Sequence, residues 1–324
     1  MKPTPIPFQV LKKILKAFSQ IKILVVGDAM LDQYWFGDTY RISPEAPVPV
    51  AKVEATESRV GGAANVARNI ASLKGEVCLL SVTGTDQNSN DLESILARDG
   101  VQTHLIKDSS INTTVKLRVL ARNQQLLRID FESSPSESAI LRLKDHFRQI
   151  VQRYNLVVFS DYDKGALKHV AELLQIAKNK GLPVLVDPKG EDYSKYSGAT
   201  LITPNRLELQ TVIGTWENEA TLTAKAQKLR KILKLKSLLL TRSEEGLSLY
   251  QAGRVVHEKT VPREVFDVSG AGDTIIAVAA LALGIGLEET LLMRLANAAA
   301  GVVVGKLGTA TCSQNELIEV LCHA

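Results

Sequence analysis

The sequence predicts an α/β fold with a mostly parallel central sheet and a small antiparallel β lid. Three observations predict it: short apolar runs, stretches of helical periodicity between them, and two segments in which strand-like residues alternate with polar ones. Continuous apolar strands that alternate with helices are typical of parallel sheets covered on both faces. The 324 residues, 45% of them hydrophobic, are ample for a large buried core.

Six apolar runs are expected to form the strands of the central sheet. In chain order they span residues 21–27, 76–82, 155–160, 182–187, 199–203 and 237–241. Most segments between them place apolar residues at helical spacing, as in ALKHVAELLQIAKNKG (166–181), which ends at a glycine. Strand therefore alternates with helix along most of the chain.

Two segments break this alternation, at residues 33–54 and 111–131. Their strand-like pattern predicts a small antiparallel sheet that projects from the main one as a lid. Their basic residues include Arg41, Lys52, Lys116, Arg118 and Arg122. The sequence has no linker rich in Gly, Pro or Ser, no internal repeat and no low-complexity tract, so residues 1–324 are expected to form one domain with this lid.

Charge and cysteine content favour a cytoplasmic protein that binds a small anion. The 39 basic and 35 acidic residues give a formal net charge of +4 without a basic block, so nucleic acid is not an expected partner. Cys78, Cys312 and Cys322 are odd in number and lack ligand spacing, which argues against disulfides and zinc. The longest apolar run, 274–287, is too short to span a bilayer, and no membrane partner is expected.

The stretch VFDVSGAGDTIIAV (265–278) places three small residues, Gly270, Ala271 and Gly272, directly before Asp273 and an apolar helix. Small residues let backbone N–H groups approach a ligand, and the N-terminus of a helix favours an anion. The alternative is a glycine-rich turn in which Asp273 caps the helix. The stretch by itself leaves both interpretations open.

Further polar residues follow the expected strands, where open parallel sheets bind their ligands. Asp28 and Asp32 follow the first strand and could accept hydrogen bonds from a polyol, or serve as a helix cap or a solvated turn. Gly61 and Gly62 stand before Asn65 at the start of a helix, a combination that suits a hydroxylated ligand.

A second polar pair follows the strand that ends at Thr203. Pro204 is expected to open a helix, so that Asn205 and Glu208 share one face of its first turn. Such a pair alone is weak evidence for a metal or phosphate site.

Taken in order, GDxMLD, GGAANVA, NxxE, TRSEEG and DVSGAGDT resemble the motifs of the ribokinase-like, or PfkB-type, carbohydrate kinases across essentially the whole chain. Within that family the sequence is most similar to heptose 7-phosphate kinases, which form part of bifunctional heptose kinase/adenylyltransferases. The finer match is carried by GDAMLDQYWFGDTYRISPEAPVPV, VGGAANVARNIASL, VKLRVLARNQQLLRIDFE and SDYDKGAL. Ser269 stands where the family usually has Thr, which keeps a hydroxyl in the loop.

This resemblance implies a ribokinase-like three-layer αβα fold and phosphorylation of D-glycero-β-D-manno-heptose 7-phosphate at its anomeric O1, with ATP and Mg²⁺, in ADP-heptose and lipopolysaccharide inner-core biosynthesis. It also implies a homodimer in which lids pair. The alternatives are a PfkB-type kinase of another sugar or sugar phosphate, and a catalytically silent sugar-binding regulator. Since the sequence has no HxGH motif, adenylyl transfer is expected from a separate chain or from a part not included here.

The resemblance assigns roles to individual residues. It implies that Asp273 is the general base and that the backbone N–H groups of Gly270, Ala271, Gly272 and Asp273 form an anion hole for the transferring phosphoryl group. The implied ATP site consists of Lys189, Asn205, Arg206, Leu207, Glu208, Thr241, Gly246 and Asn297. The implied sugar-phosphate site consists of Asp28, Asp32, Gly61, Gly62, Asn65, Lys116, Arg118, Arg128 and Lys164. Glu208 is expected to act on Mg²⁺, directly or through water.

Overall fold

The computed structural model describes residues 5–122, 124–260 and 264–322, which form two sheets and the helices around them. The larger sheet has nine strands in the order β13-β12-β11-β10-β9-β8-β1-β4-β5. The strands from β11 to β5 pair in parallel, and β12 and β13 add antiparallel strands at one edge. The mostly parallel sheet is therefore as predicted.

All six predicted strands form in this sheet. They are β1 (Lys22–Gly27), β4 (Glu76–Thr83), β8 (Leu156–Ser160), β9 (Val184–Asp187), β10 (Leu201–Ile202) and β11 (Ser237–Thr241). Three strands toward the edges were not predicted: β5 (Gln102–Lys107), β12 (Leu247–Gln251) and β13 (Arg254–Glu258). Polar residues such as His104 and Ser248 interrupt their apolar runs, which removes the signal of a fully buried strand.

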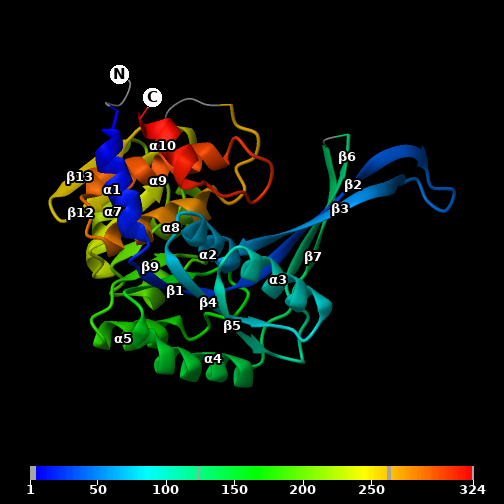
Figure 1. Cartoon of the computed structure of the whole chain (residues 1–324), viewed down its shortest axis with the longest axis horizontal. Coiled ribbons are helices and arrows are strands. Elements are labelled where there is room, and N and C mark those ends of the chain that lie inside the picture. The colour runs from blue at the N-terminus through cyan, green and yellow to red at the C-terminus, as the bar shows by residue number, and fades with distance from the viewer. Residues whose placement is uncertain (1–4, 123, 261–263, 323–324) are drawn as a thin grey trace.

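Helices cover both faces of the large sheet (Figure 1). One hydrophobic cluster includes buried residues of α1 (Phe8–Phe18), α2 (Ala63–Ser72), α3 (Gln87–Arg98), α8 (Ala271–Gly284), α9 (Glu289–Val303) and α10 (Gln314–Cys322). The cluster on the opposite face includes α4 (Glu137–Ile150), α5 (Val170–Asn179), α6 (Arg206–Ile213) and α7 (Glu219–Ile232). None of these helices, within the ranges described, is long and apolar enough to cross a bilayer.

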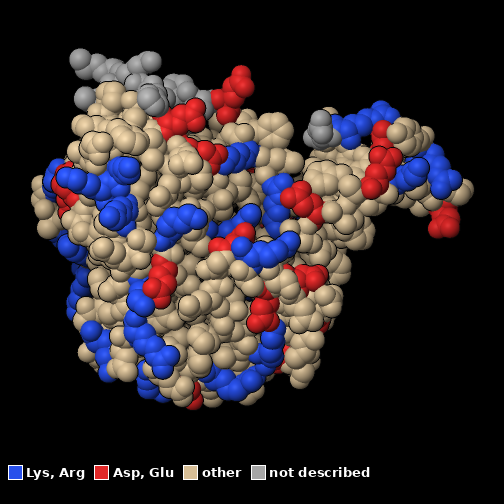
Figure 2. Space-filling view, viewed as in Figure 1, with Lys and Arg blue, Asp and Glu red and all other residues tan. Residues whose placement is uncertain are grey.

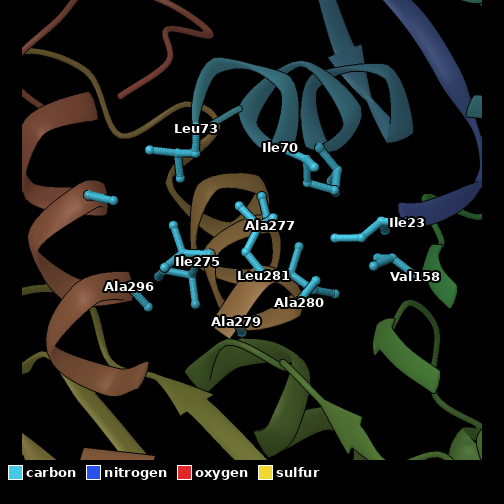
Figure 3. Packing of buried hydrophobic residues seen from close by; sticks show 14 of the residues in the cluster. Ile23, Ile70, Leu73, Val158, Ile275, Ala277, Ala279, Ala280, Leu281 and Ala296 are labelled. Atoms are coloured by element: carbon cyan, nitrogen blue, oxygen red, sulfur yellow. The ribbon is translucent and has the colours of Figure 1, made fainter. Parts of the chain in front are cut away.

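Helix α8 is the most enclosed of these elements and determines where Asp273 lies. Its residues from Asp273 to Ala282 are all buried. Figure 3 shows α8 between α2, which contributes Ile70, and α9, which contributes Ala296, with side chains of the central sheet nearby. Because alanine allows helices to pack closely, the run IIAVAALA suits an element surrounded by others.

The lid is a four-stranded sheet in the order β3-β2-β6-β7 and extends beyond the main body (Figure 1). It consists of β2 (Ala29–Ile42), β3 (Pro49–Gly62), β6 (Val115–Ala121) and β7 (Gln124–Phe131). The sheet forms as predicted, but it is mixed rather than antiparallel, because β2 and β6 pair in parallel. Strands β2 and β3 also extend beyond the predicted residues 33–54: β2 begins at Ala29, just after β1 ends, and β3 continues to Gly62.

The register gives the lid two different faces. Directly paired residues share a face, and the side-chain period of two then assigns the neighbouring rows. One face carries Asp32, Tyr34, Lys116, Arg118, Arg128 and Asp130. The other carries Trp35, Leu117, Val119, Leu127, Ile129 and Phe131. The lid therefore presents a charged surface on one side and an apolar surface on the other; Figure 2 shows charges of both signs at its free end.

Candidate active site

Asp273 lies in the first turn of α8 with only 3% of its surface exposed. The cap position is held by Gly270, so Asp273 is not the cap of this helix. Gly270 has a φ of +78°, and a Cβ there would lie 2.7 Å from Nδ2 of Asn65. Glycine is therefore required both by the backbone conformation and by the close approach of Asn65.

Two side chains donate hydrogen bonds to the Asp273 carboxylate. Nδ2 of Asn65 donates to Oδ2, and the hydroxyl of Tyr162 donates to Oδ1, each over 2.7 Å. Burial raises the pKa of Asp273 to about 6, while the two donors oppose the rise. A carboxylate with this pKa is largely ionised at neutral pH and can accept a proton.

The start of α8 also presents backbone donors. Among the described residues, the N–H groups of Gly272 and Asp273 have no hydrogen-bond acceptor, whereas Ala271 donates to the carbonyl of Val268 over 3.3 Å. A Cβ at Gly272 would meet no atom within 4 Å, so space adjoins this turn. The arrangement suits an anion, with the donors of Gly272 and Asp273 better placed than that of Ala271.

Asp267 shapes the loop before this helix, and the sequence analysis did not assign it a role. Its carboxylate accepts the N–H groups of Ser269 and Gly308, each over 2.9 Å. These bonds join the loop before α8 to the loop after α9. The repeated small and polar residues of DVSGAGD were the only sequence signal for this contact.

Asp28 lies beneath the site rather than open to it. Its buried carboxylate accepts three backbone N–H groups, from Tyr162, Lys164 and Ala166, over 2.9 to 3.1 Å. Burial raises the pKa of Asp28, and these three donors oppose that rise. The structure thus uses Asp28 to hold the loop that carries Tyr162.

Asp32 lies at the base of the lid, on its charged face. Its carboxylate pairs with Arg118 over 2.5 Å. A Cβ at Gly61 would lie 2.5 Å from Oδ2 of Asp32, so a larger residue at this position of the paired strand would displace the Asp32 carboxylate. Gly62 follows with a φ of +60°, and α2 then begins, bringing Asn65 toward Asp273.

Three cations predicted for the sugar phosphate gather near Asp32. Arg128 pairs with Asp130, and Lys164 pairs with Glu132. Lys116 is half-buried, and its ammonium has no hydrogen bond or ion pair within the described part of the chain. Burial lowers the pKa of Lys116; the nearby charges of Asp130 and Asp32 oppose this shift, and those of Lys164 and Arg128 add to it. Because Arg118, Arg128 and Lys164 each pair with a carboxylate, Lys116 is the one charge of these four without an ion pair among the described residues, and it suits a phosphate group.

A cavity of about 360 Å³ lies on the other side of the α8 start. Its lining includes Thr241, Gly246 and Asn297, three residues predicted for the nucleotide, together with Ala271 and Gly272. A nucleotide in this cavity would therefore place its phosphates beside the free donors of α8.

The predicted NxxE pair forms a capping box at the start of α6. Asn205 is the cap, its side chain accepts the N–H of Glu208, and Glu208 accepts the N–H of Asn205. The expectation that Pro204 opens the helix is wrong, because the helix begins at Arg206, after the cap. Lys189 donates to Glu208 over 2.9 Å.

Asp187 is a further carboxylate that the sequence analysis did not single out. Burial, together with the negative charges of Asp273 and Glu208, raises its pKa well above the ordinary value. Thr203 donates to Asp187 over 3.0 Å. Its place at the end of β9, directly before the predicted Lys189 loop, was the available signal.

Two residues predicted for the ATP site point elsewhere. Arg206 pairs with Glu245 and lies over the ring of Trp216, 5.9 Å from its centroid. The side chain of Leu207 is 74% exposed. Neither residue lines the cavity beside α8.

The chain matches the family model described as pfkB family carbohydrate kinase over residues 20–316. It is 48% identical over 299 residues to D-beta-D-heptose 7-phosphate kinase of Bordetella bronchiseptica, covering 92% of this chain and 96% of that protein. It is 49% identical over 308 residues to Bifunctional protein HldE of Proteus mirabilis, covering 95% of this chain. The chain spans 65% of the length of that bifunctional relative.

Solved structures agree on the fold. Phosphofructokinase-2 from Escherichia coli in complex with fructose-6-phosphate gives a TM-score of 0.78 at 20% identity, covering 94% of this chain and 99% of that one. Arabidopsis thaliana ribokinase complexed with ribose and ATP gives a TM-score of 0.73 at 21% identity, covering 93% and 98%. At such identities the similarity concerns the fold alone.

Tyr162→Phe should raise the pKa of Asp273 above about 6, because the carboxylate loses one of its two side-chain donors and remains buried. Carbon-13 NMR titration of the aspartate carboxyls, with Asp273→Asn to assign the signal, measures this directly. Tyr193→Phe is the matched control, because the buried Tyr193 hydroxyl has no partner among the described residues. An equal titration midpoint in Tyr162→Phe and wild type would show that this hydrogen bond does not support the ionised form.

Proposed function

The chain belongs to the pfkB family of carbohydrate kinases, and we propose that it transfers a phosphoryl group from ATP to the anomeric O1 of D-glycero-β-D-manno-heptose 7-phosphate. The product would be the 1,7-bisphosphate, an intermediate of ADP-heptose and lipopolysaccharide inner-core biosynthesis. The observation that carries the proposal is the buried carboxylate of Asp273, which lies beside free backbone donors between a cavity and the charged face of the lid. ATP as the phosphoryl donor agrees with the cytoplasmic location expected from the sequence.

Phosphoryl transfer requires alignment of donor and acceptor, stabilisation of charge on the phosphoryl oxygens, and removal of one proton. Asp273 would accept the proton of the O1 hydroxyl. The N–H groups of Gly272 and Asp273 would donate to the phosphoryl oxygens, with a smaller contribution from Gly270 and Ala271. Donors fixed before the reaction are effective because they need no reorganisation as charge develops.

The nucleotide would occupy the cavity lined by Thr241, Gly246 and Asn297. Gly246 has a φ of +93°, and a Cβ there would overlap the carbonyl of Glu258, so glycine keeps this wall of the cavity in place. Asn297 is held by its donation to the carbonyl of Lys259 over 2.9 Å. Arg206 and Leu207, which point away from this cavity, would contribute only through the backbone of α6.

The carboxylates of Asp187 and Glu208 suit a Mg²⁺ ion bound beside the phosphates of ATP. Asp187 has a raised pKa because Asp273 and Glu208 add to the effect of burial, and a cation would relieve that repulsion. The described residues contain no group of three or more His, Cys, Asp or Glu side chains that could hold a metal by themselves. Mg²⁺ commonly takes one or two carboxylates, several waters and substrate phosphates. Asp187, and Glu208 through water, would hold the ion, which would neutralise phosphate charge.

Lys189 would help to bind the phosphates of ATP. Its ammonium now donates to Glu208, whose other carboxylate oxygen accepts the N–H of Asn205. A phosphate group bound between Lys189 and the N-terminus of α6 would interact with both the lysine ammonium and the positive end of the helix dipole. The capping box keeps Glu208 and Asn205 in one arrangement.

The sugar would lie between Asp273 and the charged face of the lid. Asp32, Gly61 and Asn65 line the path from the base of the lid to Asp273 through the contacts already described. Gly62 and Asp28 would act indirectly, Gly62 by turning the chain into α2 and Asp28 by holding the Tyr162 loop. Lid closure would exclude water and so limit hydrolysis of ATP.

The 7-phosphate would bind near Lys116, Arg118, Arg128 and Lys164. Lys116 is the strongest candidate because its ammonium has no partner among the described residues, while Arg118 and Arg128 already pair with Asp32 and Asp130. An anionic group beside Lys116 would offset the desolvation that lowers its pKa.

The apolar face of the lid would pair with the same face of a second copy to form a homodimer. Leu127 is 54% exposed there, and Trp35, Ile129 and Phe131 are also exposed. Apolar side chains grouped on one face of a projecting sheet are typical of an interaction surface. The adenylyltransferase activity of bifunctional relatives would come from a separate chain or from a part of the protein outside this sequence.

Asp273→Asn should keep the fold and ATP binding but lose turnover by a factor on the order of 10²–10⁴, because the amide cannot accept the proton. The test is a coupled ADP-release assay with ATP and Mg²⁺ against a panel of sugars and sugar phosphates. Wild type should prefer heptose 7-phosphate. Preference for another sugar would indicate a different PfkB-type kinase, and wild type without turnover on the panel would indicate a regulator.

Lys116→Met should raise KM for heptose 7-phosphate about 10-fold or more and leave KM for ATP nearly unchanged, because one charge-assisted contact to the 7-phosphate is lost. Lys52→Met is a control that removes a lysine farther out on the lid, where Lys52 pairs with Asp38 in the strand register. If Lys116→Met leaves the KM for the sugar phosphate at the wild-type value, Lys116 does not bind the 7-phosphate.

Leu127→Lys should shift the protein from dimer to monomer at micromolar concentration, because a charge on the apolar lid face would be buried without a partner. Sedimentation velocity measures the shift. Ile232→Lys is the matched control: Ile232 is also exposed, but it lies on α7. A wild-type monomer, or a dimer that persists in Leu127→Lys, would refute pairing through this face.

A further inference from the structure

A row of buried polar side chains lies behind Asp273, between α2 and α8. It consists of Asn65, Asn69 and Thr274, none of which is more than 1% exposed. Asn65 contacts Asp273, whereas Asn69 and Thr274 lie farther from the open part of the site. Burying a polar side chain costs free energy of folding unless its hydrogen bonds are satisfied. The hydrogen-bond partners of these three side chains therefore have to be accounted for.

The neighbouring groups determine which atom is the donor in each hydrogen bond of this row. Nδ2 of Asn69 lies 2.9 Å from the backbone carbonyl of Asn65 and 3.3 Å from its Oδ1, and both of these atoms are acceptors. The Asn69 amide must therefore turn its nitrogen toward Asn65 and its oxygen toward Thr274. Thr274 then has to donate to Oδ1 of Asn69, over 2.9 Å.

The same logic fixes the amide of Asn65. Because its Oδ1 accepts from Asn69, its Nδ2 is left to face Asp273, where it donates over 2.7 Å. The hydroxyl of Thr274 also lies 3.0 Å from the carbonyl of Gly270, which is a second possible acceptor for its one proton. That carbonyl already accepts the backbone N–H of Thr274, whereas Oδ1 of Asn69 has no other donor among the described residues, so donation to Asn69 satisfies both acceptors. The hydrogen bonds thus run in one direction, from Thr274 to Asn69, from Asn69 to Asn65 and from Asn65 to Asp273. We call this series of three hydrogen bonds the relay.

We propose that Thr274 and Asn69 are positioning residues that hold the Asn65 amide with its N–H groups, and not its oxygen, toward the base. This inference rests on the proposed role of Asp273 in proton transfer. If the relay is broken, Asn65 can rotate and place an oxygen against the carboxylate, where two acceptors repel each other. The other groups facing Asp273 are the Tyr162 hydroxyl and the carboxyl groups of Asp32 and Asp187. The charge of Asp32 raises the pKa of Asp273, whereas the charge of Asp273 raises the pKa of Asp187.

The test compares two substitutions at one position. Thr274→Val removes the hydroxyl and keeps the shape, whereas Thr274→Ser keeps the hydroxyl. We expect Thr274→Val to lower kcat about 10-fold, with KM for ATP within about twofold, and to move the acid limb of the pH–rate profile to higher pH, because the base loses a directed donor. Thr274→Ser should retain most of kcat and the wild-type pH profile.

Thr309→Val is the matched control. Thr309 is also buried, lies against the Gly270 turn, and has a hydroxyl with no partner among the described residues. Its substitution should leave both kcat and the pH profile unchanged. Loss of activity in Thr309→Val equal to that in Thr274→Val would attribute the effect to general packing and overturn the inference.

Asn69→Leu provides a second break in the relay, and carbon-13 titration of Asp273 provides a readout independent of turnover. Both Asn69→Leu and Thr274→Val should raise the titration midpoint of Asp273, even if the wild type proves to act on another sugar. Failure of the proposed function would appear as absent turnover of heptose 7-phosphate by wild type with these shifts intact. If the folded Thr274→Val and Asn69→Leu variants keep the wild-type titration midpoint of Asp273 and the wild-type pH profile, the inference is overturned.

Discussion

A carboxylate removed from water keeps its charge only where other donors replace the water, and Asp273 depends on this constraint. Burial alone disfavours its ionised form, while Asn65 and Tyr162 oppose the effect with two short hydrogen bonds. The outcome is a pKa of about 6. Such a group is largely ionised at neutral pH, yet it is more basic than an exposed aspartate, which suits the general base proposed here.

Several parts of the fold serve this one carboxylate. The packing of α8 against α2 brings Asn65 to one oxygen, and Gly270 makes room for it. Asp28 holds the loop that brings Tyr162 to the other oxygen. The free N–H groups of the same helical turn border the cavity proposed for the nucleotide, so the proposed proton acceptance and charge stabilisation would both take place at one turn of α8.

The sequence predicted what depends on local pattern. Buried strands produce continuous apolar runs, and the turn before α8 needs glycine, so both were evident. Asn69 and Thr274 were missed because their contact joins residues 205 positions apart. The parallel pairing of β2 and β6 was missed for a similar reason, since it depends on how two distant segments leave the main sheet. Arg206 and Leu207 were included by their place in a motif, although their side chains point away from the cavity.

The pH dependence of kcat at saturating sugar phosphate and ATP tests the role of the buried Asp273 most directly, because kcat/KM would also report the phosphate of the free sugar phosphate, which titrates at about pH 6. A base that must be ionised loses activity as the pH falls through its pKa, so the rate should decline below about pH 6. The residual activity of Asp273→Asn should lack this acid limb. An acid limb near pH 4, where an ordinary aspartate titrates, or an identical limb in Asp273→Asn, would contradict the account.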